Sequence, residues 1–282
     1  MVMNLCSSVS QAVAEPLAGS APQARLWVLL EQPGPWGRDA VVASHLEPSV
    51  GHALKQWSAG QPVRLGLIRR VGRHADDATA MRRRTVLLAR SDPGSVWLRV
   101  ELVTDPLSLL DINLANLLNG SAEQPTPGPR TLLVCTNARR DRCCALLGRP
   151  LAARLESTFD GDVWETSHLG GHRFAPTLVS LPDGYLFGGK QAGALSTAAC
   201  RGRSTLEPAA QVAELAALRH LGYHQPLALK VTSDPPDHWW VSAPGREPLR
   251  VEVTSRDSPD RREESCGKPS VNWQRLTATV ID

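Results

Sequence analysis

Apolar and polar positions in the first half of the chain follow a pattern that predicts strands and helices in the order β-α-β-β-β-α. Short apolar runs bounded by loops rich in glycine and proline indicate strands, whereas apolar positions three or four residues apart indicate helices. The turn Asp92-Pro93-Gly94 separates the last two strands. Strands are predicted at residues 26–30, 63–68, 85–89 and 96–102, and helices at residues 38–57 and 107–117.

The same order of elements returns after a polar, proline-rich connector at residues 121–130. A β-α-β unit followed by a β-hairpin and a helix is similar to the thioredoxin-like plan, and Pro176, just before a predicted strand, resembles the proline that this fold has there. We therefore expect an α/β protein with two tandem thioredoxin-like units. In the second unit, strands are predicted at residues 131–135, 163–166, 177–181 and 185–187, and helices at residues 139–158 and 208–221.

The last part of the chain is predicted to be a small C-terminal antiparallel β appendage. Its β-rich runs at residues 227–232, 239–242, 249–254 and 273–281 are broken by charged loops. The chain is therefore expected to divide into a flexible leader (1–24), an N-terminal thioredoxin-like unit without cysteines (25–125), a second thioredoxin-like unit (126–226) and the β appendage (227–282).

Composition narrows the class of protein. A chain of 282 residues with 42% hydrophobic and 21% charged residues is typical of a packed globular protein, which excludes disorder throughout. Its longest apolar runs fall far short of the roughly 20 residues that span a bilayer, so no membrane segment is expected. The net charge of +3 is too small to indicate nucleic-acid binding. The N-terminus lacks the basic start and apolar core of a signal peptide, so a cytoplasmic protein is expected.

Three of the six cysteines lie close together in the second unit: Cys135, Cys143 and Cys144. In a reducing compartment such a cluster indicates metal or redox chemistry rather than a disulfide scaffold. The other cysteines, Cys6, Cys200 and Cys266, are scattered along the chain.

Two histidines follow the next predicted strand and complete a candidate site. Cys135 ends one strand, Cys143 and Cys144 lie near the start of the next helix, and His168 and His172 follow the parallel strand. Because the carboxyl ends of parallel strands meet the helix N-terminus at one sheet edge, two thiols and two imidazoles are expected to converge there. Such a donor set suits tetrahedral zinc or a [2Fe-2S] cluster with mixed ligands.

The loop between the two histidines favours the cluster. In a zinc finger, two histidines four residues apart lie on a helix, whereas Gly170 and Gly171 between these two predict a tight loop. A glycine loop also leaves backbone N–H groups free to hydrogen-bond to cluster sulfides.

At these residues the chain resembles the sucrase/ferredoxin-like family, which in characterised members are thioredoxin-like ferredoxins with bis-histidinyl [2Fe-2S] ligation. The matching motifs are Cys-x8-Cys from Cys135 and His-x-Gly-Gly-His-Arg-Phe-Ala from His168. The resemblance is strongest over residues 131–190 and fainter over the N-terminal unit. It implies that Cys135 and Cys144 hold one iron and that His168 and His172 hold the other. Asn137 replaces a histidine that is common in the family at a position that is not a ligand.

This resemblance and these residues predict that the protein transfers electrons and does not carry out substrate chemistry. If the protein is an enzyme, we expect an oxidoreductase. No paired carboxylates, no nucleophile with a base and no complete nucleotide loop stand out in the sequence. Neutral imidazoles raise the cluster potential relative to four thiolates, and each ligating ring keeps a second nitrogen that can lose a proton, so reduction is expected to take up a proton. The expected partner is a redox protein or reductase. An acidic partner would be attracted by the neighbouring arginines, which are Arg139, Arg140, Arg142 and Arg173. The same arginines also fit a solvated, salt-bridged start of a helix.

Two other hypotheses use the same residues. In a thiol oxidoreductase or thiol redox sensor, Cys135 would form a reversible disulfide with Cys143 or Cys144, although the Cys-x-x-Cys spacing of such enzymes is missing. A structural zinc site with the four ligands is the third hypothesis.

Two other motifs carry no functional hypothesis. Ser265-Cys266-Gly267 lies in a charged loop with no mechanism assigned to it. The glycines before Lys190 fit a hairpin and its exit better than a phosphate loop.

Overall fold

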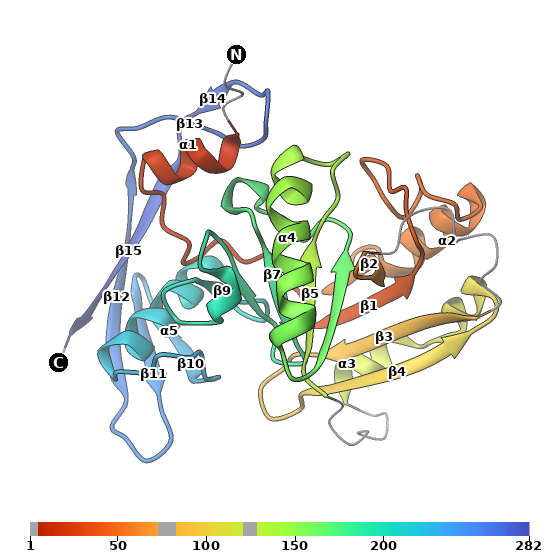
Figure 1. The fold of residues 1–282 in the computed structure, drawn as a ribbon. Coiled ribbons are helices and arrows are strands. Elements are labelled where there is room, and N and C mark those ends of the chain that lie inside the picture. Colours follow the sequence, from red (N-terminus) through yellow and green to blue (C-terminus); the bar gives the residue numbers. More distant parts are fainter. Residues whose placement is uncertain (1–4, 73–82, 121–128, 282) are drawn as a thin grey trace. The chain divides into compact units, whose positions relative to one another are not determined.

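The computed structural model describes residues 5–72, 83–120 and 129–281, which divide into two compact units (Figure 1). Unit 1 comprises Met1–Gln23, Gly170–Thr177 and Tyr185–Asp282, and unit 2 comprises Ala24–Leu169 and Leu178–Gly184. Each unit is described by itself below.

The core of unit 2 is a mixed sheet with the strand order β4-β3-β1-β2-β6-β5-β7. In each repeat the first two strands, β1 with β2 and β5 with β6, are parallel neighbours. The next strand, β3 or β7, pairs antiparallel with the first. The bounds are β1 Leu26–Glu31, β2 Val63–Arg70, β3 Arg84–Arg90, β4 Trp97–Val103, β5 Thr131–Cys135, β6 Asp162–Thr166 and β7 Leu178–Leu181.

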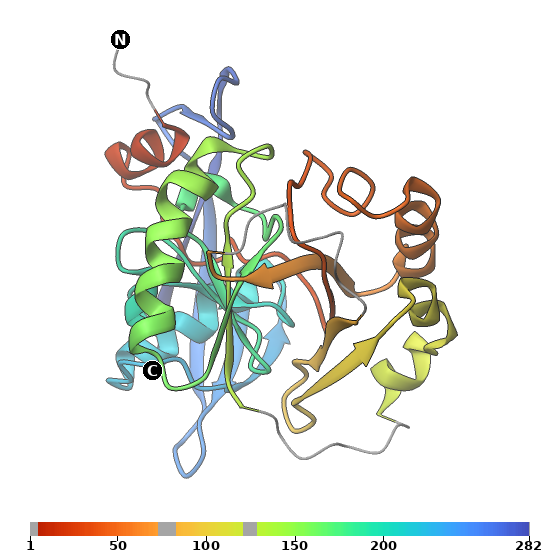
Figure 2. The ribbon, with the colours of Figure 1, turned by 45° about the vertical axis from the view of Figure 1, so that its right-hand side comes forward.

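The two repeats are joined edge to edge within this sheet. Strands β2 and β6 pair antiparallel in the register Ile68↔Thr166, Arg69↔Glu165 and Arg70↔Trp164. Strands β1 and β5 are buried along their whole length, which explains their almost continuous apolar sequences. Helix α2 (Pro48–Ser58) packs on β2, and helix α4 (Arg142–Thr158) packs on β5 and β6 (Figure 2).

Several helix boundaries differ from the predicted ones because local caps decide them. The helix predicted from residue 38 begins at Pro48, where a proline suits the first turn because its missing N–H is not needed there. The helix predicted at residues 107–117 is split into the 3-10 helix Pro106–Asp111 and α3 (Leu114–Asn119), which Asn113 caps by accepting from the backbone N–H of Asn116.

Unit 1 contains the predicted C-terminal antiparallel sheet, which is confirmed, with the strand order β10-β11-β12-β15. Helix α5 (Pro208–His220) packs against this sheet and against β9, which pairs with β8. The sequence pattern does not predict β9, because its residues Cys-Arg-Gly-Arg show no apolar alternation. The strands of unit 1 are β8 Tyr185–Phe187, β9 Cys200–Arg203, β10 Lys230–Asp234, β11 His238–Ser242, β12 Leu249–Asp257, β13 Arg262–Glu263, β14 Ser270–Val271 and β15 Gln274–Ile281.

A short N-terminal helix lies in the segment expected to be a flexible leader. Helix α1 (Cys6–Ala12) buries Cys6, Ser7 and Ser10 and packs against β13 and against the 3-10 turn His172–Phe174. The sequence pattern does not predict this helix, because its small polar residues give little apolar periodicity.

The α/β class with two thioredoxin-like repeats and a small C-terminal β appendage is confirmed, whereas the domain boundaries at residues 24, 125 and 226 stay a prediction. Most of the connector at 121–130 and part of a basic segment at residues 69–84, including Arg73 and Arg82, lie outside the described residues. Within the described part of that segment, Arg69 is buried in β2. Among the residues that the structure describes, no helix has the length and apolar character that a bilayer crossing requires.

Candidate metal centre

The ends of β5 and β6 and the start of α4 meet at one edge of the sheet in unit 2. Cys135 is the last residue of β5 and pairs with Thr166 at the end of β6, two residues before His168. Cys144 lies in the first turn of α4, whose N-terminus is capped by Asp141 through a 2.9 Å hydrogen bond from the backbone N–H of Cys143. The helix therefore begins at Arg142, three residues later than predicted.

Three of the four predicted ligands come together at this edge. His168 Nδ1 lies 3.9 Å from Cys135 Sγ and 4.0 Å from Cys144 Sγ. The three donor atoms all lie within 4.8 Å of one another, with both cysteines buried and His168 partly exposed. A soft, enclosed sulfur pair with an imidazole at its open side is the donor set that zinc and iron–sulfur centres use.

The two thiols differ in acidity because a hydrogen bond joins them. The hydrogen bond from Cys144 holds the pKa of the Cys135 thiol well below its usual range against the opposing effect of burial, and His168 lowers it further. The same hydrogen bond, together with burial, raises the pKa of Cys144. Cys135 is therefore the more acidic of the two thiols, and a metal ion that binds both sulfurs would displace the remaining protons.

A glycine in α4 allows the helix to approach Cys135. A Cβ atom on Gly148 would collide with the backbone carbonyl oxygen of Cys135 and contact the side chain of Thr136. Gly148 is buried, so a larger residue could not escape into solvent. The close approach of α4 to β5 brings Cys144 within reach of Cys135.

Arg64, in the repeat without cysteines, contributes a positive charge to the site. Its Nη2 donates a 2.8 Å hydrogen bond to the backbone oxygen of His168. Burial lowers the pKa of Arg64, and the negative charge on Cys135 acts in the opposite direction. The guanidinium nevertheless stays protonated at neutral pH. The motif search missed Arg64, although a charged residue inside the apolar strand β2 was a visible signal.

His168 also lines a small open cavity of about 180 Å³ in unit 2. Arg38 and Arg140 lie in its walls, and Asn137 forms part of its floor. Asn137 shapes the loop after β5, because its Oδ1 accepts from the backbone N–H groups of Arg139 and Arg140 at 3.1 and 3.3 Å. Asn137 therefore has a structural role in this loop.

Two further candidates, Cys143 and His172, are not members of this group of three donors. The nearby group of donor atoms contains Cys144 and not its neighbour Cys143, as the motif spacing implies. His172 opens the 3-10 turn of unit 1, and its place beside the other ligands stays a prediction. Gly170 and Gly171 have φ values of +87° and +70°, so the predicted tight loop between the histidines is confirmed.

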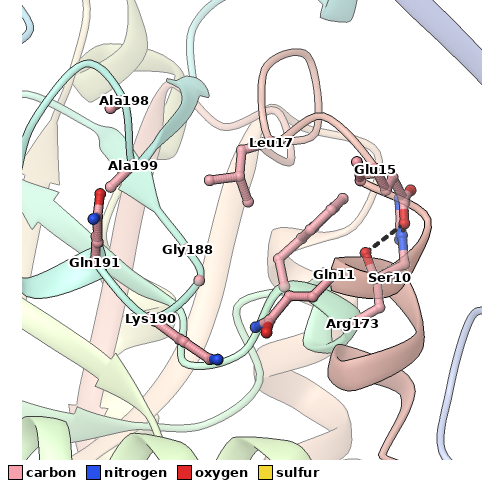
Figure 3. Close-up of a pocket in the computed structure, with 13 residues that line it drawn as sticks. Ser10, Gln11, Glu15, Leu17, Arg173, Gly188, Lys190, Gln191, Ala198 and Ala199 are labelled. Atoms are coloured by element: carbon pink, nitrogen blue, oxygen red, sulfur yellow. Dashed lines mark hydrogen bonds and ion pairs between the residues drawn. The ribbon is translucent and has the colours of Figure 1, made fainter.

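A larger cavity of about 470 Å³ lies in unit 1, next to the turn that carries His172 (Figure 3). Arg173 and Phe174 of the turn line it, and Figure 3 shows Lys190 and Gln11 pointing toward one another across it. The glycines before Lys190 leave β8 in a hairpin exit, where Gly188 and Gly189 donate to Ala199 and Phe174. This arrangement agrees with the hairpin interpretation and not with a phosphate loop.

Comparison with known proteins gives one match. The model of a family described as Suc_Fer-like, sucrase/ferredoxin-like, matches residues 17–203, a range that includes every candidate ligand, the first repeat and all of the second repeat before helix α5. No curated protein and no solved structure matches the chain.

Proposed function

Because this chain belongs to the sucrase/ferredoxin-like family, we propose that it is an electron-transfer protein that binds a [2Fe-2S] cluster through Cys135, Cys144, His168 and His172. The observation that carries the proposal is the convergence of Cys135, Cys144 and His168 at the edge of the sheet in unit 2. A bound cluster of this kind supplies a one-electron redox couple. The protein supplies the thiolates, the imidazoles and the charge of Arg64.

The orientation of His168 supports a role for Nδ1 as a metal ligand and for Nε2 as the nitrogen that carries a proton. Its Nδ1 faces the two sulfur atoms, so Nε2 points away from them. Because His168 is partly exposed and lines an open cavity, Nε2 can exchange its proton with water. This geometry supports the proposal that reduction is coupled to proton uptake.

The partner that we propose is an acidic redox protein or reductase. Arg38 and Arg140 lie in the walls of the cavity at His168, and Arg139 and Arg142 are close by in sequence. Arg38, Arg139 and Arg142 are exposed, so these cations can attract a negatively charged surface to the side on which His168 opens. The rate of electron transfer should then fall as ionic strength rises.

Two observations favour the other candidates. Zinc with sulfur and nitrogen ligands places these atoms roughly 3.5 Å apart, which is close to the 3.9 and 4.0 Å found here and favours a single metal ion. The lowered pKa of Cys135 favours a thiol redox pair with Cys144, because the thiolate is the nucleophile in disulfide exchange.

The colour and metal content of the purified protein distinguish the cluster, the zinc site and the thiol pair. A red-brown protein with visible absorption that dithionite bleaches, and with about two irons and two labile sulfides per chain, supports the cluster. Colourless folded protein with one zinc per chain supports the zinc site. Colourless metal-free protein that forms a Cys135–Cys144 disulfide supports the thiol pair.

Adjacent cysteines offer a matched test of the ligands. Cys144→Ser should abolish iron binding, whereas Cys143→Ser should leave the iron content and the visible spectrum unchanged. His172→Cys should retain the cluster, shift its spectrum and lower its potential, because a thiolate adds negative charge. An unchanged spectrum in His172→Cys would remove His172 from the ligand set.

A further inference from the structure

A second pair of thiols lies in unit 1, between the two ends of the chain. Cys266 Sγ is 3.6 Å from Cys6 Sγ, although the two residues are separated by 260 positions in sequence. The backbone N–H of Cys6 also donates to Cys266 Sγ at 3.4 Å, so a second contact joins the two residues. Cys6 begins helix α1, and Cys266 belongs to the loop between β13 and β14.

The surroundings hold the two segments in place. Helix α1 packs against β13, as Figure 1 also shows. Just after the helix, Glu15 bonds to Arg262 of β13 at 3.1 Å and to Arg173 at 2.8 Å, and it accepts from Ser10 at 2.7 Å. The Glu15 side chain is only 4% exposed, so these contacts form a buried anchor for the N-terminal segment.

The loop that carries Cys266 can supply the small movement that a covalent bond requires. A disulfide has a sulfur–sulfur distance of about 2.05 Å, so the two atoms need to approach by roughly 1.5 Å. Ser265 accepts from the backbone N–H of Lys268, and Gly267 has a positive φ of 76°, so Cys266 sits in a tight surface turn.

We propose that Cys6 and Cys266 form a reversible disulfide when the protein meets a peroxide oxidant. Cys266 is partly exposed whereas Cys6 is buried, so Cys266 reacts first. Its thiolate attacks hydrogen peroxide, an S–O bond forms as the O–O bond breaks, and the product is a sulfenic acid and one water.

The second step closes the disulfide. The Cys6 thiol loses its proton and its sulfur attacks the Cys266 sulfur, so that the S–S bond forms as the S–O bond breaks and a second water leaves. In total, two thiols lose two electrons and two protons, and one peroxide is reduced to two waters. A thiol reductant reverses the reaction by thiol–disulfide exchange.

The Cys6–Cys266 disulfide would link helix α1 covalently to the loop between β13 and β14. Because α1 packs against the turn His172–Phe174, this link would fix the segment that lies against this turn. It would also close a loop of nearly the whole chain, which strongly restricts the unfolded state.

Peptide mapping of the full-length protein tests the proposal. The protein, as purified, is treated with a small excess of hydrogen peroxide, quenched with catalase, alkylated in denaturant and digested with trypsin without reduction. Residues 1–25 and 263–275 form tryptic peptides with one cysteine each. We expect these two peptides to appear linked, with a mass two hydrogens below their sum, and to separate after reduction. Linkage of either cysteine to Cys143, or alkylated Cys6 and Cys266 after oxidation, would overturn the proposal.

Cys200 provides the internal control. It is fully buried, and burial raises the pKa of its thiol to about 12, so it should remain a thiol under the same treatment. Oxidation of Cys200 to the same extent as Cys266 would mean that the peroxide attacks all thiols, which contradicts a specific pair.

Two variants separate the roles of the two cysteines. In Cys6→Ser/Cys143→Ser, the Cys266 sulfenic acid should persist and be trapped by dimedone, whereas in Cys266→Ser the buried Cys6 should stay reduced. Oxidised wild type should unfold several degrees higher than reduced wild type, and neither variant should show this shift. An equal shift in the variants would assign the stabilisation to another pair.

Discussion

Arg64 places a cation beside the donors from a repeat that contains no ligand. Its charge acts on Cys135, and its hydrogen bond holds the backbone of His168. Reduction of the proposed cluster would add a negative charge to the centre, and a nearby cation stabilises that state. We expect Arg64→Gln to lower the midpoint potential by on the order of tens of millivolts, measured by potentiometric titration. Arg64→Lys is the control that keeps the charge, and equal potentials in all three proteins would contradict an electrostatic role.

The ring nitrogen of His168 that points away from the sulfurs predicts a dependence of the potential on pH. If the reduced state binds one proton more than the oxidised state, raising the pH removes that proton and disfavours reduction. The midpoint potential should therefore fall as pH rises, by up to about 59 mV per pH unit for one proton per electron. The measurement is a titration series from about pH 6 to 10, in which His168→Cys should show a weaker slope. A flat potential in the wild type would contradict proton uptake at the imidazoles.

At this scale the sequence predicted which side chains converge and missed their surroundings. The convergence of Cys135, Cys144 and His168 could be predicted because each follows or begins an element whose end is visible in the apolar pattern. Arg64 and the Cys6–Cys266 pair could not, because their contacts join positions 104 and 260 residues apart and no local pattern encodes such distances.

Among the helices, α4 is the one whose packing decides the geometry of the sulfur pair. Replacing a helical glycine by alanine usually stabilises a helix by roughly 1 kcal/mol. At Gly148 the new methyl group would strike the carbonyl oxygen of Cys135, so the helix must move away from β5. We expect Gly148→Ala to lose most of its bound iron and to melt at a lower temperature, as measured by metal analysis and thermal unfolding.

Arg149→Ala is the matched control for this change, because Arg149 is the next residue in α4 and is exposed. It should keep the iron content and the melting temperature of the wild type. A Gly148→Ala protein with full iron content and raised stability would show that the close approach of α4 to β5 is not required.

The elements themselves were predicted well where apolar periodicity is strong and poorly where single residues decide. Strands β1 and β5 stand out as buried apolar runs. The starts of α2 and α4 depend on Pro48 and on the cap at Asp141, which the apolar pattern does not mark. Helix α1 and strand β9 are short and are ordered by tertiary contacts, which override weak local preference.

For the chain as a whole, the sequence predicted the two repeats but not how their strands pair with each other. Each copy shows its own order of elements, but the pairing of β2 with β6 depends on which edges meet. A buried ion pair joins strands β2 and β6. Arg69 Nε donates to Glu165 Oε2 at 2.8 Å, both side chains are almost fully buried, and Thr136, next to Cys135, donates to the same oxygen at 2.7 Å.

This pair provides the test of coupling between the repeats. Glu165→Gln leaves the Arg69 charge buried and uncompensated, which should lower the free energy of unfolding by about 3–5 kcal/mol and weaken iron retention beside Thr136. Adding Arg69→Met removes the orphaned charge, so the double variant should be more stable than Glu165→Gln alone. Denaturant unfolding of the two single variants and the double variant gives the coupling energy. Additive losses would mean that the two side chains act independently, and the first repeat would then have no electrostatic hold on the strand that leads to His168.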